Sequence, residues 1–169
     1  MNVKRNLRLS VRKEVETQLI AMGYTNIYGE STMRAKTTPT RPYCFLMDSF
    51  VRPMETTLPF VIIEMRNLTR QPFEIGNRTG HESKVFLHIF GRTRGDRDDI
   101  ASYLQDNIPD AFQYYDFTTG SSGSAVTGTM ITLSDKSDIE DVPGIPDEVI
   151  TESSLSNWNM LSFETSLKI

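Results

Sequence analysis

The first hydrophobic pattern in the chain is helical. Apolar side chains stand four residues apart at Leu7, Val11, Val15 and Leu19. This spacing places them along one face of an α-helix. Gly23 follows the last of them, and glycine commonly ends a helix. The pattern therefore predicts a helix over residues 4–22 with a charged opposite face.

Residues 83–104 predict a strand, a tight turn and a second helix. Side chains alternate along residues 83–90, and both sets contain apolar groups, which is typical of a central strand. One set is Val85, Leu87 and Ile89, and the other is Phe86, His88 and Phe90. Gly91 breaks the strand, and the helical spacing of Ile100 and Leu104 predicts the second helix.

Other segments also have the pattern of a strand, but the pattern is clearer in some segments than in others. The run PFVIIEM at residues 59–65 is short, branched and apolar, which is typical of a buried strand. Weaker patterns predict strands at residues 24–28, 43–47, 111–117, 125–133 and 154–168. Loops are expected near residues 29–42, 48–58, 66–80, 118–125 and 135–153, where polar residues, glycine or proline prevail.

These elements predict one α+β domain over residues 1–169. We expect a mostly antiparallel sheet of about six strands with two helices packed on it, because most strands are joined without a crossover helix. The length is sufficient to bury a core without disulfides or a metal.

Composition narrows the class of protein. The formal net charge is -4, so the chain as a whole lacks a polycationic nucleic-acid signature. The single cysteine, Cys44, lies in an apolar run and is interpreted as a small buried hydrophobe. The N-terminus has no apolar segment typical of a signal peptide, and no apolar run approaches the roughly 20 residues of a membrane helix. We therefore expect a soluble protein made inside the cell, with no membrane partner.

The sequence contains no catalytic pattern with the required spacing. His81 and His88 are in no zinc-binding motif, and residues 96–99 lack the spacing of a calcium loop. Those aspartates suit the positive end of a helix dipole instead. Residues 120–124 resemble a nucleophile elbow only superficially. We therefore expect no enzymatic activity, cofactor or metal; a small hydrolase using either histidine with residues 96–99 is the alternative.

The charges suggest interaction surfaces. Five basic residues precede the first acid, Glu14, and residues 135–152 hold seven acids and one lysine. A solvated surface explains both runs, and contact of the first helix with an acidic partner is the alternative.

An ordered series of segments resembles the neck and tail-completion proteins of tailed bacteriophages. The series comprises an apolar strand ending in Glu64, a P-x-x-x-G stretch, a strand ending in Phe90-Gly91, an R-G-x-R-D-D helix start and a Y-D-aromatic strand. These segments occupy residues 58–64, 72–76, 85–91, 94–100 and 115–117, and residues 158–166 resemble the last strand of that group.

The resemblance implies a gpU-like tail terminator, an α+β virion protein that caps the tail tube. Such proteins form a hexameric ring between the tail tube protein and the head–tail connector, and genomic DNA passes through the lumen without specific binding. The implied location is the virion, after assembly in the host cytoplasm. A head-side connector of the neck is the alternative. The residues expected at subunit or neck contacts are Arg5, Arg12, Lys13, Arg92, Arg94, Arg97, Asp138, Glu140 and Asp141.

Overall fold

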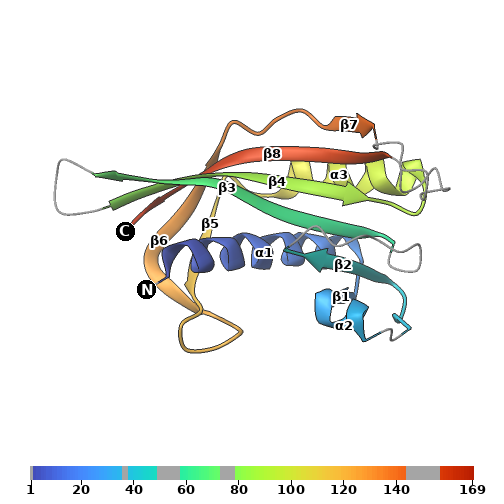
Figure 1. The fold of residues 1–169 in the computed structure, drawn as a ribbon, viewed down its shortest axis with the longest axis horizontal. Helices are drawn as coiled ribbons and strands as arrows, with labels where there is room; N and C mark the ends of the chain where they lie inside the picture. The colour runs from blue at the N-terminus through green and yellow to red at the C-terminus, as the bar shows by residue number, and fades with distance from the viewer. Residues whose placement is uncertain (1, 36–37, 49–57, 73–78, 144–156) are drawn as a thin grey trace.

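The computed structural model describes residues 2–35, 38–48, 58–72, 79–143 and 157–169. A curled sheet of eight strands runs through this part of the chain, and helices pack within its curve (Figure 1). The mixed, sheet-dominated architecture confirms the coarse fold class predicted from the sequence.

Two long helices follow their predicted patterns. Helix α1 (Val3–Met22) begins where the Asn2 side chain accepts a hydrogen bond from the Arg5 N–H, and it ends at Gly23 with a positive φ of 119°. Helix α3 (Arg94–Asn107) begins where Thr93 Oγ1 accepts from the Asp96 N–H. A third, short helix is α2 (Glu30–Arg34).

The strands form one sheet with the order β1-β2-β3-β4-β8-β6-β5, and β7 pairs with residues 157–160 of β8, before the stretch of β8 that pairs with β6. Pairing is parallel between β1, β2 and β3 and antiparallel elsewhere. The strands are β1 (Asn26–Tyr28), β2 (Tyr43–Met47), β3 (Phe60–Pro72), β4 (Thr79–Phe90), β5 (Ala111–Asp116), β6 (Ser124–Ser134), β7 (Glu140–Pro143) and β8 (Asn157–Lys168).

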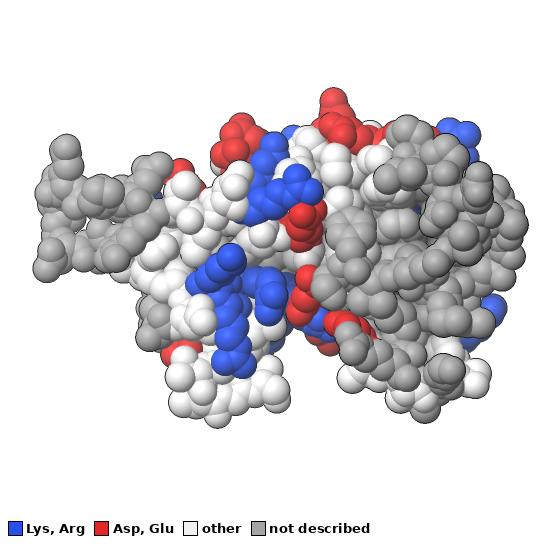
Figure 2. Space-filling view, viewed as in Figure 1, with Lys and Arg blue, Asp and Glu red and all other residues white. Residues whose placement is uncertain are grey.

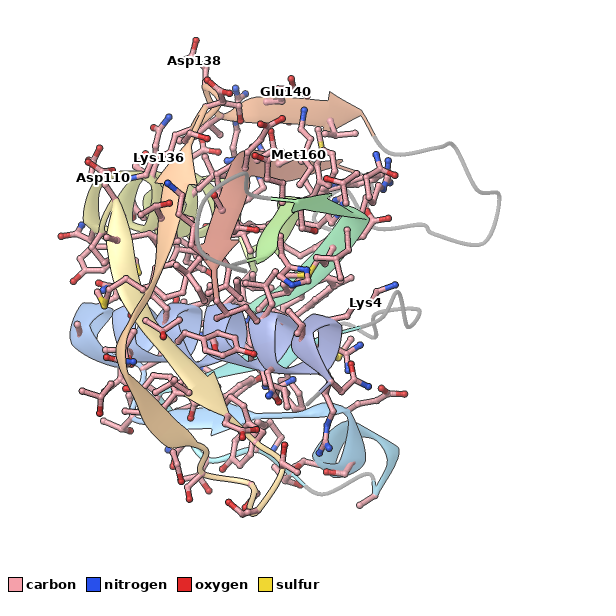
Figure 3. The ribbon with its side chains drawn as sticks, turned by 90° about the vertical axis from the view of Figure 1, so that its left-hand side faces the viewer. Lys4, Asp110, Lys136, Asp138, Glu140 and Met160 are labelled. Carbon is pink, nitrogen blue, oxygen red and sulfur yellow. The ribbon has the colours of Figure 1, made fainter. Side chains whose placement is uncertain are left out.

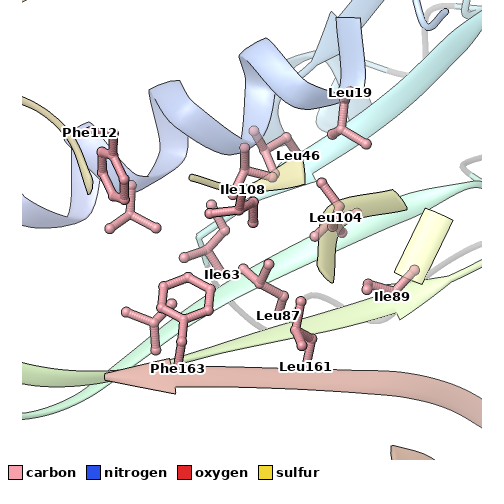
Figure 4. Close-up of a cluster of buried hydrophobic side chains, with 14 of the residues drawn as sticks. Leu19, Leu46, Ile63, Leu87, Ile89, Leu104, Ile108, Phe112, Leu161 and Phe163 are labelled. Carbon is pink, nitrogen blue, oxygen red and sulfur yellow. The ribbon is translucent and has the colours of Figure 1, made fainter. Parts of the chain in front are cut away.

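Both long helices cover the same face of the sheet. Leu19 of α1 and Leu104 of α3 belong to one buried cluster with Leu87 of β4 (Figure 4). Alternate strand residues, such as Phe60 and Phe90, point to the opposite face, where their rings stack 4.4 Å apart in a second buried cluster. Residues 87–90 at the end of β4 are therefore buried on both faces, as expected for a central strand, whereas Phe86 is half-buried and Lys84 is exposed.

Two polar residues in the buried stripe of α1 cap the outer edge of β5. The Ser10 hydroxyl accepts a hydrogen bond from the Tyr115 N–H at 3.0 Å, and Asn6 Oδ1 accepts from the Phe117 N–H at 3.2 Å. Asn6 Nδ2 also donates to Asp116 Oδ1. Because an edge strand exposes unpaired backbone groups, these contacts explain why Asn6 and Ser10 are buried in an otherwise apolar stripe.

Several expected loops contain regular structure. The loop expected from residue 29 contains α2, so the structure has a short third helix in addition to the two that were predicted. Residues 66–72 continue β3, and Thr79 already belongs to β4, because the two strands pair beyond the core as a polar ribbon. The acidic segment contains β7, which forms an antiparallel pair with β8. The parts of the expected loops at residues 36–37, 49–57, 73–78 and 144–153 lie outside the described residues.

Candidate interaction surfaces

Arg97 and Asp141 were expected at subunit contacts, and the structure brings them together within one chain. Arg97 Nη1 lies 3.2 Å from Asp141 Oδ1, and Arg97 Nε lies 3.3 Å from Asp98 Oδ1. The Arg97 side chain is only 7% exposed, whereas that of Asp141 is 55% exposed. The pair therefore holds β7 against the start of α3, and a neighbouring molecule can reach its carboxylate side more readily than its guanidinium.

The other two arginines near the start of α3 differ in exposure. Arg92 Nε donates to the Leu58 carbonyl at 2.9 Å, and its guanidinium lies 5.0 Å from the centre of the Tyr43 ring. Arg94 has a side chain that is 81% exposed, with Asp98 3.7 Å away. Arg92 thus connects parts of the same chain, while Arg94 is available at the surface.

The basic residues of α1 also differ in whether their side chains bond within the chain. Arg12 pairs with Asp48 at 2.9 Å. Lys13 Nζ donates to the Ser122 carbonyl and lies 3.8 Å from the centre of the Tyr115 ring. Arg5 is exposed and has no side-chain bond or ion pair within the described residues.

A cavity of about 350 Å³ opens between the first turns of α1 and β3. Its lining includes three cationic side chains, Lys4, Arg5 and Arg8. We call this site the cation pocket. Figure 2 shows Lys and Arg side chains gathered over the beginning of α1, with acidic side chains beside them. Among the described residues none of the three has an ion-pair partner, and Arg8 Nε is buried without a hydrogen-bond partner.

Sequence reasoning identified only Arg5 of these three residues as a contact candidate. The signal for the whole site was present, because Lys4 and Arg8 are among the five basic residues that precede the first acid. The sequence could not show that Arg12 and Lys13 bond to other residues of the same chain.

Two carboxylates line the same pocket, and each is already paired. Asp48 contacts Arg12. Glu64 accepts two hydrogen bonds from Arg66, at 2.6 and 2.8 Å, and lies 3.1 Å from His88 Nε2. The Arg66 hydrogen bonds lower the pKa of Glu64, with a further contribution from His88, although burial opposes the shift. Glu64 is therefore an ionised carboxylate that has its own cation.

His88 has both ring nitrogens occupied. Trp158 Nε1 donates to His88 Nδ1 at 3.2 Å, so the neutral ring carries its proton on Nε2 and donates it to Glu64. Burial lowers the pKa of His88, and Glu64 opposes this shift. The whole residue is 5% exposed. A general base needs a nitrogen within reach of a substrate, and this histidine offers none.

The hydrolase alternative also required the aspartates of α3. Asp98 accepts a hydrogen bond from Asn159, which pairs with Ile89 on β4. His88 is the neighbour of Ile89, and successive strand residues point to opposite faces of a sheet. Asp98 and His88 therefore lie on opposite sides of the sheet.

Other chemical features are equally sparse in the part of the chain that the structure describes. There is no group of three or more potential metal ligands among these residues. Cys44 is fully buried, and burial raises the pKa of its thiol, which matches the expected role as a core residue. None of the described helices has the length and hydrophobicity needed to span a membrane.

Asp138 and Glu140 lie at the acidic edge of the molecule. Both are exposed, and Figure 3 shows Asp138 pointing outward from the segment before β7. The segment is held in place by Ser137, whose N–H donates to the Ser162 carbonyl at 2.8 Å and whose carbonyl accepts from Gln105 at 3.0 Å. Glu140 thus begins β7, and Asp138 lies in the segment before it, which Ser137 tethers to β8 and α3.

No protein-family model matches the chain, and no curated protein matches it either.

Proposed function

We propose that the protein is a ring-forming structural subunit of a tailed-phage virion, which caps the tail tube and joins it to the head connector. The family resemblance supplies this role. The observation that supports it is the separation of opposite charges on one chain, with the cation pocket at the start of α1 and exposed acids beside β7.

A closed ring of identical subunits needs two different surfaces that fit each other, because the contact is head-to-tail rather than symmetric about a two-fold axis. The cation pocket and the β7 acids satisfy this requirement for charge. The hydrogen bonds at both ring nitrogens of His88 favour a structural role for this residue over a hydrolytic one.

The test is electron microscopy of the purified protein together with mass measurement of the intact assembly. Rings of about six subunits are expected for a tail-tube cap. Rings of about twelve would favour the alternative, a head-side connector. A chain that forms no ring at any concentration would contradict both.

A catalytic role is tested separately with His88→Gln in an esterase and peptidase screen. We expect no activity in the wild-type protein. Turnover in the wild type that His88→Gln abolishes would contradict the structural assignment.

A further inference from the structure

We propose that the cation pocket binds the carboxylates of Asp138 and Glu140 from a second copy of the chain. This inference rests on the homo-oligomer of the proposed function and names the two surfaces that meet in it.

The cations of the pocket are placed where the helix itself disfavours them. Lys4, Arg5 and Arg8 occupy the first two turns of α1, and the first turn holds no acidic residue. The N-terminal end of a helix carries partial positive charge, which destabilises nearby cations. Lys4 and Arg8 are also four residues apart, so like charges adjoin on one face. A bound anion relieves both repulsions.

The carboxylates already in the pocket do not supply that anion. Asp48 is paired with Arg12, and Glu64 is paired with Arg66 and His88. The buried Nε of Arg8 has no hydrogen-bond partner in the described part of the chain. The volume of about 350 Å³ accommodates carboxylate side chains.

A carboxylate fits this pocket better than a nucleic acid. Glu64 and Asp48 at the pocket wall repel a run of phosphates, whereas single carboxylates can be placed beside the three cations. The net charge of -4 also opposes binding of a long polyanion.

The acids near β7 supply charge of the opposite sign. Asp141 forms an ion pair with Arg97. The lysine nearest in sequence, Lys136, forms an ion pair with Asp110 and donates a hydrogen bond to the Ile108 carbonyl. Asp138 and Glu140 have no ion pair within the described residues. They are two residues apart, so in an extended segment they project to the same side. The Ser137 contacts hold this segment in place, which reduces the entropy lost on binding.

The two surfaces lie apart on one subunit. Figure 3 shows Lys4 and the Asp138–Glu140 segment on separate parts of the molecule. A contact between them therefore joins different patches of neighbouring copies, as a head-to-tail ring requires.

Two charge-reversal variants test the inference. The first carries Lys4→Glu and Arg5→Glu, and the second carries Asp138→Lys and Glu140→Lys. The control carries Asp99→Lys and Asp106→Lys, which reverses two exposed acids of α3 with the same change in net charge as the second variant. Self-association of each is measured by sedimentation at about 50 and about 500 mM salt, because screening weakens exposed charge pairs.

We expect each reversal variant alone to associate about tenfold or more weakly than the wild type, whereas the control associates like it. A mixture of the two variants should recover association, because each variant's altered surface then meets an opposite charge on the other. Wild-type association should weaken at the higher salt concentration.

Other outcomes separate the inference from the proposed function. If the wild type forms rings and both reversal variants do so equally well, the proposed contact between the cation pocket and the two acids is wrong, while the proposed ring-forming function is retained. If the wild type remains monomeric under every condition, the inference and the ring are both overturned. If instead Lys4→Glu with Arg5→Glu abolishes binding of a short DNA duplex and leaves self-association unchanged, the pocket takes phosphates and the inference is wrong.

Discussion

Arg97 Nη1 and Asp141 Oδ1 lie 3.2 Å apart, and this contact joins β7 to the start of α3 across 44 positions of sequence (141 minus 97). The guanidinium is almost fully buried while the carboxylate is half exposed. A buried cation that loses its partner is costly, so the pair is best understood as a connection within the subunit.

Replacing Asp141 by asparagine should therefore destabilise the fold modestly. We expect Asp141→Asn to lower the free energy of unfolding by about 1 kcal/mol, because Asp98 still contacts Arg97 and the lost carboxylate is partly solvated. Glu140→Gln changes the neighbouring acid, which has no ion pair among the described residues, and should stay within about 0.5 kcal/mol of the wild type. Urea denaturation measures both. Equal effects of the two substitutions would show that the ion pair contributes nothing.

Gly91 allows α3 to approach the end of β4. A Cβ added at this position would lie 2.4 Å from the backbone nitrogen of Arg97 and 2.7 Å from its Cα, so helix and strand would have to separate. We expect Gly91→Ala to destabilise the protein by about 1–3 kcal/mol. Gly120→Ala is the control, because nothing lies within 4 Å of a Cβ there. Thermal unfolding compares them, and a Gly91→Ala protein as stable as the control would contradict the close packing.

Asn6 should be more important for stability than its polar character suggests. Asn6→Ala removes the acceptor of the buried Phe117 N–H and the donor to Asp116, for an expected loss of about 1–3 kcal/mol. Thr17→Ala on the exposed side of α1 is the control, since the one hydrogen bond of the Thr17 side chain among the described residues is to the carbonyl of Lys13 in its own helix. Chemical denaturation should show no comparable loss for the control. A neutral Asn6→Ala would mean that water satisfies the edge of β5 instead.

Stability should fall as the solution is acidified, in part because of His88. Burial lowers the pKa of folded His88 below its usual 6.5, so the unfolded chain takes up a proton that the folded chain does not. The stability contributed by this group is present above pH 6.5 and is lost as the pH falls through the lowered pKa. Glu64 acts in the same direction at more acidic pH, because its pKa lies below its usual 4.5.

The measurement is the free energy of unfolding between about pH 7.5 and about pH 5 for the wild type and His88→Gln. The variant should have a shallower pH dependence, whatever its absolute stability. An unchanged slope in the variant would show that His88 does not titrate differently in the folded and unfolded chains.

Much of the fold could be predicted from hydrophobic spacing alone. Apolar residues recur at every fourth position in α1, and they can share one buried face only in a helix. The residues that lead to Phe90 alternate between two apolar sets, which can be buried on opposite faces only in a strand. The strand ending at Met65 was recognised for the same reason. Its continuation to Pro72 was missed, because those polar residues gain order only from backbone pairing with β4.

The candidate site was less predictable. That α1 is basic and that the segment near β7 is acidic can be read from the sequence, since charge is carried by residue type. Which of those charges remain available was decided by tertiary structure, because an ion pair depends on distances between elements that lie far apart in the chain. The fold uses Arg12, Lys13, Arg97 and Asp141 internally and leaves Lys4, Arg5, Arg8, Asp138 and Glu140 without ion-pair partners among the described residues.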